Sequence, residues 1–192
     1  MLRRCFQVSL GIGFLIAAAA VANAQEVVHA LSGTVSAIHP GAKTIIIKTN
    51  DGSDGLFKDL TQSNVSLLFD KEIRSRTTPA DAFKDQGAQV IVYYIGGGFG
   101  AFADRTAVSL QSLGAGPIEK TDGTVVSSKK HILTIKTNSG TQETFQIGDS
   151  AVAETATGVM NADKFDPRKG DQVRVVADID NGRKNLLFVR ED

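Results

Sequence analysis

Short apolar runs bounded by turn residues recur along the chain downstream of residue 24. Two of them, Thr44–Lys48 and Ile132–Lys136, are rich in β-branched residues, and each is followed by an Asn-x-Gly turn. Side chains alternate between the two faces of a strand, so we expect Ile45 and Ile47, like their counterparts in the second run, to point into a core. This pattern predicts short strands joined by tight turns.

These two runs belong to a long internal repeat. The tetrapeptide Ile-Lys-Thr-Asn begins at Ile47 and again at Ile135, 88 residues later, and Phe57 and Phe145 have the same separation. The tripeptide Gly-Thr-Val that begins at Gly33 returns 90 residues later. A period of this length exceeds the roughly 20–50 residues of solenoid repeats. The repeat therefore predicts two tandem domains of the same fold.

The segment Gly114–Pro117 is the expected junction, because glycine and proline interrupt a strand pattern. We expect a first domain over residues 26–114 and a second over residues 117–192. Each domain ends in an apolar strand, Thr106–Leu110 in the first copy and Leu186–Val189 in the second.

One short helical turn is expected within each copy. Thr78 directly precedes Pro79, an arrangement that predicts a capping side chain followed by the first helical residue, and Asn161 predicts a similar cap in the second copy. Phe83 and Phe165 follow these turns and are expected to fill the base of each domain. About six strands and one helical turn in each copy predict an all-β chain with two tandem barrels of the oligonucleotide/oligosaccharide-binding (OB) type.

The order of these elements resembles the bacterial domain of unknown function 5666. The segment Phe165–Val175, in which Gly170-Asp171 precedes an alternating valine strand, carries the resemblance most clearly. The first copy departs from it, because Asp85–Ala88 lacks the Gly-Asp pair. The resemblance covers nearly all of residues 27–190 and implies a secreted OB-like barrel. Its shared residues are turn formers and core positions, so it transfers no catalytic residue.

The first 24 residues are typical of a cleaved signal peptide. Two adjacent arginines precede an apolar run, and residues 22–24 (Ala-Asn-Ala) fit the small-x-small pattern that predicts cleavage after Ala24. We expect a periplasmic or secreted protein, exported by the Sec route, with no transmembrane helix after cleavage. The alternatives are a retained membrane anchor and the twin-arginine route, whose motif requires an apolar residue where this chain has Gln7.

The charge of the chain is balanced, with 21 basic and 21 acidic residues. Removal of the signal peptide takes away two basic residues and no acidic one, which leaves a net charge of −2. Nucleic-acid binding usually needs a clustered basic surface, so no nucleic-acid partner is expected. The single cysteine, Cys5, lies in the signal peptide, so the exported chain has neither disulfides nor cysteine-based metal sites.

The sequence contains no recognisable catalytic constellation. It has neither a Gly-x-Ser-x-Gly motif nor a P-loop. The Gly96–Ala103 segment matches G-x-G-x-x-A, but it is expected to join two strands rather than to open a helix, so no dinucleotide cofactor is expected. The Asp-Gly segments at 51–55 and 178–182 do not fit a calcium loop and are interpreted as turns. We predict a non-enzymatic protein without metal or cofactor.

Two sites outside the expected cores are candidates for partner contacts. Phe99 and Phe102 lie on the glycine-rich loop and are expected either to meet a partner or to fold back over the barrel. Arg74 and Arg76 are expected on one face of a strand. There they would bind an anionic ligand or keep the strand edge from pairing with another chain.

Tyr93 and Tyr94 are adjacent and must point to opposite sides of their strand. One of them is expected in the core. The other, with Phe57 or Phe69 nearby, would form a stacking surface for a sugar or a base.

These observations favour an exported, non-enzymatic protein that binds an unknown protein or glycan partner. The alternative is a structural spacer of the cell envelope without a small ligand, and a hydrolase or metal enzyme is the least favoured class. The argument for binding rests on the fold class and on the aromatic loop, since the repeat itself specifies only turns and cores.

Overall fold

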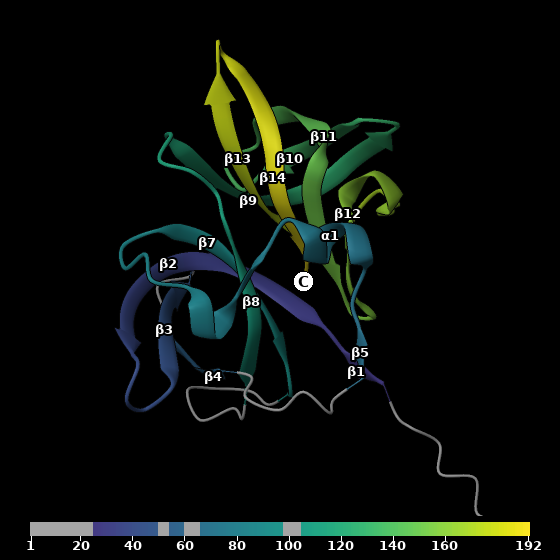
Figure 1. Cartoon of the computed structure of the whole chain (residues 1–192). Helices are drawn as coiled ribbons and strands as arrows, with labels where there is room; N and C mark the ends of the chain where they lie inside the picture. Colours follow the sequence, from purple (N-terminus) through teal and green to yellow (C-terminus); the bar gives the residue numbers. More distant parts are fainter. Residues whose placement is uncertain (1–24, 50–53, 60–65, 98–104) are drawn as a thin grey trace, which may run out of the picture.

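The computed structural model (Figure 1) describes residues 25–49, 54–59, 66–97 and 105–192. Strands make up most of this part of the chain, and its helices are short. The strands form two six-stranded sheets, one from each half of the chain. A two-stranded parallel pair, β1 (Glu26–Val27) with β5 (Leu67–Leu68), lies beside the first sheet.

The first sheet contains, in spatial order, β4 (Asp54–Asp59), β3 (Thr44–Thr49), β2 (His29–His39), β7 (Gln89–Ile95), β8 (Thr106–Ser112) and β6 (Thr78–Pro79). β4 also pairs in parallel with β8, so the five strands other than β6 close into a barrel. Among the described strands, the short strand β6 pairs only with β8 and lies outside this closed set. Their inward side chains form one apolar core, which includes Leu31, Ile45, Phe57, Val90 and Leu110.

The second sheet contains, in spatial order, β10 (Ile132–Thr137), β9 (Ile118–Lys129), β13 (Gln172–Asp180), β14 (Arg183–Glu191), β11 (Gln142–Thr155) and β12 (Gly158–Asn161). An additional pairing of β10 with β11 closes five of these strands into a second barrel. Its core includes Val125, Leu133, Phe145, Val175 and Leu186.

Both barrels have the same connectivity. In each, the first strand pairs with the second and the fourth, and the third strand pairs in parallel with the fifth. Small five-stranded barrels of this kind are OB-like. The predicted fold class, all-β with two tandem OB-like barrels, is confirmed.

The repeated Gly-Thr-Val marks a close approach of two strands in each barrel. A Cβ atom at Gly33 would lie 2.5 Å from the carbonyl oxygen of Lys48, and one at Gly123 would lie 2.5 Å from that of Lys136. Real Cβ atoms do not make such short contacts, so the crossing of the first strand over the second requires glycine. The repeat therefore preserves a packing constraint and not a binding residue.

The predicted helix caps are wrong in both copies. Thr78 and Pro79 form the short strand β6, and the 3-10 turn η1 (Ala80–Ala82) that follows has no side-chain cap. In the second copy, Asn161 directly precedes the 3-10 turn η2 (Ala162–Lys164), but its side chain does not cap this turn. The amide of Asn161 instead bonds to side chains of the first barrel.

Helix α1 (Lys71–Ser75) occupies a segment that was expected to be a strand. Asp70 caps this helix, since its carboxylate accepts hydrogen bonds from the backbone N–H groups of Glu72 and Ile73. The prediction that Arg74 and Arg76 share a strand face is therefore wrong. Figure 1 shows α1 beside β12, at the level where the first barrel (purple to teal) meets the second (green to yellow).

The two barrels share a third apolar core that lies between them. The first barrel contributes outward side chains of β2 and β7, with Ile73 of α1, and the second contributes side chains of β11, β13 and β14. The buried members are Val28, Ala30, Ile73, Ile91, Tyr93, Ile95, Val152, Val176 and Phe188. Strand β7 is thus buried on both faces, because Val90 and Val92 belong to the core of the first barrel. The barrels form one packed body through this shared core.

Candidate functional site

Polar side chains surround the shared core and join the barrels. Glu154 on β11 is only 6% exposed, and its Oε1 atom lies 2.7 Å from Nδ1 of His29. Its Oε2 atom accepts a hydrogen bond of 2.9 Å from the backbone N–H of Ala30. Burial raises the pKa of Glu154, and the hydrogen bond to His29 opposes this effect. Both oxygens of this carboxylate are thus satisfied by the first barrel.

A second polar contact joins α1 to the second barrel. Arg76 donates from Nη1 to the carbonyl oxygen of Asp149 at 2.6 Å and from Nη2 to Oδ1 of Asn161 at 2.8 Å. Asn161 is 4% exposed and donates to Oε2 of Glu72 at 3.1 Å. Arg76 therefore holds the two barrels together, whereas Arg74 is exposed on α1.

Tyr93 and Tyr94 lie in different apolar environments. Tyr93 is fully buried in the shared core, where its ring lies 5.1 Å from that of Phe69 and its hydroxyl donates to Oε1 of Gln111 at 2.7 Å. Burial raises the pKa of Tyr93 far above its ordinary value. Tyr94 is half-buried and packs against the core of the first barrel. Tyr93 is therefore the core residue of the pair.

Tyr94 belongs to a group of residues at one end of the first barrel. The Cζ atom of Arg105 lies 5.6 Å from the centroid of the Tyr94 ring and 5.7 Å from that of Phe57. The Phe57 ring meets Tyr94 edge-on at 5.4 Å, and the His29 ring lies 6.0 Å from Tyr94. We call Phe57, Tyr94, Arg105 and His29 the Arg105 cluster.

The rings of this cluster are partly covered by neighbouring side chains. Phe57 is fully buried, and the guanidinium of Arg105 lies over the Tyr94 ring, so these rings do not offer a bare platform. Arg105 itself is half-buried. Phe99 and Phe102 lie outside the residues that the structure describes.

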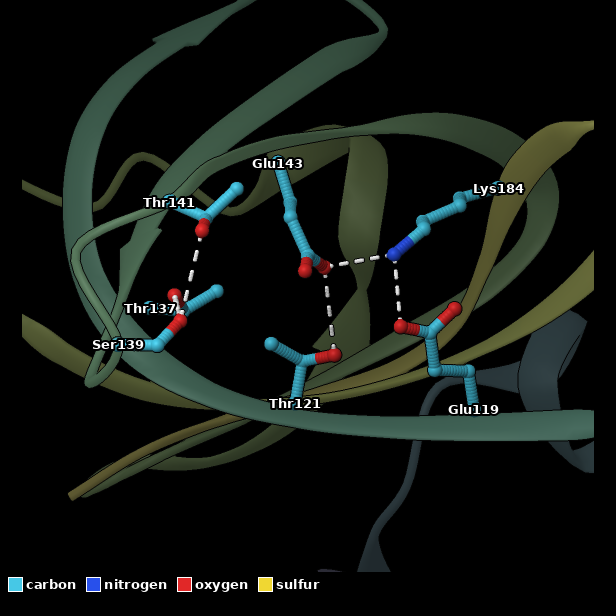
Figure 2. A network of polar contacts seen from close by, with 7 residues as sticks. All are labelled: Glu119, Thr121, Thr137, Ser139, Thr141, Glu143 and Lys184. Atoms are coloured by element: carbon cyan, nitrogen blue, oxygen red, sulfur yellow. Dashed lines mark hydrogen bonds and ion pairs between the residues drawn. The ribbon is translucent and has the colours of Figure 1, made fainter.

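A corresponding cation lies at one end of the second barrel (Figure 2). Nζ of Lys184 donates to Oε1 of Glu119 and to Oε2 of Glu143, both at 2.7 Å, and lies 5.7 Å from the ring centroid of Phe145. The hydroxyl of Thr121 donates to Oε2 of Glu143 at 3.4 Å. We call these five residues the Lys184 cluster. Burial alone would lower the pKa of Lys184, but the hydrogen bonds and charges of the two glutamates raise this pKa above its ordinary value.

The hydroxyl groups of Thr137, Ser139 and Thr141 form a second set of contacts in Figure 2. They lie at the turn between β10 and β11 and bond to each other at 2.7 and 3.5 Å. These contacts brace a tight turn in which Gly140 has a φ of 90°.

Strand register shows that the two cations occupy equivalent positions. Phe57 pairs with Ile45 as Phe145 pairs with Leu133, in the strand pairs that correspond between the barrels. The fifth strand begins its parallel pairing at Thr106 in the first barrel and at Asn185 in the second. Arg105 and Lys184 directly precede these two residues. Each cation therefore has the same position relative to the phenylalanine of its own barrel.

The positions equivalent to the two anionic partners of Lys184 carry no carboxylate in the first barrel. Glu143 pairs with Ile135, and the equivalent partner of Ile47 is Gly55. Glu119 lies four residues before Gly123, and the residue four before Gly33 is His29. Among the described residues, no carboxylate lies within ion-pair distance of Arg105.

The electrostatic surroundings of Tyr94 contain three charged groups. Burial, followed by the charge of Glu154, raises the pKa of the Tyr94 hydroxyl, while Arg105 and Arg190 act to lower it. Glu154 is the acidic group of these three, and each of its oxygens is bound to the first barrel.

The second barrel also carries a hollow of about 290 Å³ near β12 and η2. It is lined by Thr155, Ala156, Thr157, Met160, Lys164, Phe165, Asp166 and Glu191. Lys164 in this hollow lies 3.9 Å from Asp70 of the first barrel. The lining mixes small hydroxyl, apolar and oppositely charged side chains without a concentrated charge.

No group of three or more His, Asp or Glu residues that could hold a metal ion occurs among the described residues. None of the helices described is long and apolar enough to cross a membrane.

No protein-family model and no curated protein matches the chain. The resemblance to domain of unknown function 5666 therefore stays a prediction from the sequence pattern.

Sequence reasoning missed Arg105, Lys184 and the contact between His29 and Glu154. The first two had a readable signal, because Arg105 comes directly before the apolar closing strand of the first copy and Lys184 comes two residues before that of the second. The third had none, since His29 and Glu154 are 125 residues apart and meet only when the barrels pack together.

Proposed function

We propose that the protein is an exported, non-enzymatic binding protein in which the Arg105 cluster receives a protein or glycan partner. This proposal rests on one observation: the cations at the equivalent ends of the two barrels differ in whether carboxylates of the same chain neutralise them. Lys184 is bound by two glutamates, whereas Arg105 has no carboxylate partner among the described residues. A half-buried cation without an internal partner is a favourable contact point for an anionic group of another molecule.

The shared core supports this proposal by fixing the second barrel against the first. Phe188 and Val176 of the second barrel are buried against the outer face of the first. Glu154 also fixes His29, so the second barrel holds one wall of the Arg105 cluster in place. A preorganised site binds with less loss of conformational entropy than a flexible one.

Recovery of a partner from an extract of the exporting cells tests this function. The exported protein and its Arg105→Ala and Lys136→Ala variants would be immobilised, and the retained proteins and glycans would be quantified. Lys136 is exposed on β10 of the second barrel and serves as a charge-matched control. We expect a partner that the Lys136→Ala variant retains and the Arg105→Ala variant loses. Equal recovery by both variants would reject the Arg105 cluster as the binding site.

The structural-spacer alternative also has an observation in its favour. The continuous core between the barrels would hold the two barrels in one fixed relative position. A spacer requires that rigidity but not the cation of Arg105. A variant of Arg105 that leaves partner recovery and cell-envelope integrity unchanged would favour this alternative.

A further inference from the structure

We propose that the Arg105 cluster binds paired carboxylates of an acidic peptide segment on a partner protein. This inference rests on the proposed function and names the chemistry of its ligand. In the second barrel, the fold itself shows how the equivalent position is neutralised: two glutamate side chains bind the cation over a phenylalanine ring. The first barrel retains the cation and the ring, and neither equivalent position, Gly55 nor His29, carries a carboxylate.

On β4, the position equivalent to Glu143 is Gly55, which carries no carboxylate. A Cβ atom at Gly55 would lie 2.8 Å from Cε2 of the Phe57 ring, and Phe57 is fully buried. Any side chain at the position equivalent to Glu143 would therefore collide with the ring. No carboxylate therefore reaches Arg105 from this position of β4.

The first barrel also does not supply a carboxylate from β2. The position equivalent to Glu119 is occupied by His29, whose Nδ1 atom lies 2.7 Å from Glu154. Glu154 is the acidic group nearest to this histidine, and its second oxygen accepts the N–H of Ala30. Both oxygens of Glu154 are thus engaged at the interface between the barrels, and neither forms an ion pair with Arg105.

The shape of the cluster favours a carboxylate ligand. The guanidinium of Arg105 is held over Phe57 and Tyr94, which restricts its orientation. A guanidinium group of fixed orientation forms paired hydrogen bonds with a planar carboxylate. Arg190 adds a second positive charge near Tyr94, which offsets the charge of Glu154.

A peptide is favoured over an acidic sugar for two reasons. The internal counterpart in the Lys184 cluster is formed by glutamate side chains from two separate strands. The Tyr94 ring, in addition, already lies against the guanidinium of Arg105, whose Cζ atom is 5.6 Å from the ring centroid. A segment with several glutamates can place two carboxylates around the cation without an aromatic platform.

Fluorescence anisotropy with a labelled hexaglutamate peptide tests this inference on the exported protein. A hexaglutamine peptide serves as the uncharged control, and trigalacturonate and inorganic phosphate serve as competitors. We expect hexaglutamate to bind with a salt-sensitive affinity and the Arg105→Ala variant to bind about tenfold or more weakly. Arg105→Lys should lose less affinity, and Lys136→Ala should bind like the wild type.

The second barrel offers an independent readout. Glu119→Gln together with Glu143→Gln removes both charges that neutralise Lys184, so this double variant should bind hexaglutamate at two sites in place of one. Wild-type affinity in the Arg105→Ala variant would overturn the inference, and so would stronger competition by trigalacturonate or phosphate than by unlabelled hexaglutamate. If hexaglutamate fails to bind but partner recovery still depends on Arg105, the acidic-peptide assignment is wrong and the proposed function stands. If neither depends on Arg105, both are wrong.

Discussion

Glu154 of the second barrel binds His29 of the first, with 2.7 Å between Oε1 and Nδ1. Its other oxygen accepts the N–H of Ala30, so one carboxylate fixes two adjacent residues of β2. Glu154→Ala would leave the buried N–H of Ala30 without an acceptor. We expect the free energy of unfolding to fall by about 1–3 kcal/mol, measured by urea denaturation. The exposed control Glu26→Ala should have little effect, and equal midpoints for both variants would contradict the prediction.

The Glu154 carboxyl also makes the stability of the folded protein depend on pH in a defined direction. Burial raises the pKa of Glu154 above the 4.5 of an ordinary glutamate, although the bond to His29 opposes the shift. The folded state therefore holds this proton more tightly than the unfolded state does. The resulting stabilisation is present at low pH and is lost as the pH rises from 4.5 through the folded pKa.

The Glu154→Gln variant isolates this effect because glutamine does not titrate. The free energy of unfolding of the wild type should fall, relative to that of Glu154→Gln, as the pH rises above 4.5. Urea unfolding of both proteins over a series of pH values measures this difference. A wild type that gains stability relative to the variant over that range would show that the sign is wrong.

Phe188 is 2% exposed in the shared core, and its removal tests whether the barrels unfold together. Phe188→Ala should cost about 3–5 kcal/mol. It should also separate the unfolding of the two barrels into two transitions, because the apolar contact between them is weakened. Phe145→Ala is the matched control, since it removes the same side chain from the core of the second barrel alone. Calorimetry that gives the same unfolding profile for both variants would contradict a coupling role for Phe188.

The repeated glycines give a prediction that involves no binding at all. Gly33→Ala and Gly123→Ala each place a Cβ atom 2.5 Å from a backbone carbonyl oxygen. Relief of such a contact requires backbone movement, so each variant should lose about 1–3 kcal/mol of stability. Gly148→Ala is the control, because a Cβ atom there has no neighbour within 4 Å. Thermal melting compares the three variants, and equal melting temperatures would be inconsistent with the close strand crossing.

Export predicts a defined chain end. The mass of the protein recovered from the periplasm or the medium should correspond to a chain that begins at Gln25, since cleavage is expected after Ala24. A recovered protein that retains the apolar segment would instead support a membrane anchor.

Local sequence patterns were sufficient for the fold class. Ile45, Ile47 and Phe57 alternate in the first copy as their counterparts do in the second, and this alternation reflects one buried face for each strand. Because the pattern occurs in both copies, each copy supports the strand prediction made for the other. Helix α1 was missed because it is only five residues long, and its cap at Asp70 follows a segment without helical periodicity.

The contacts between the barrels could not be read in the same way. The run Val90–Ile95 is apolar at each position, which is typical of a strand buried on both faces. Which residues cover the second face depends on the packing of Val152, Val176 and Phe188, far away in the sequence. Similarly, Arg76 looked like a ligand-binding cation until Asn161 was placed beside it.

The most direct measurement is an NMR titration of the isotope-labelled exported protein with hexaglutamate. We expect the Nε–Hε resonance of Arg105 and the backbone resonances of Tyr94 and Phe57 to shift in a saturable manner. The resonances around Lys184 should not move, because Glu119 and Glu143 already neutralise that cation. Shifts centred on the second barrel, or no saturable shift at Arg105, would contradict the assignment of the Arg105 cluster as the binding site.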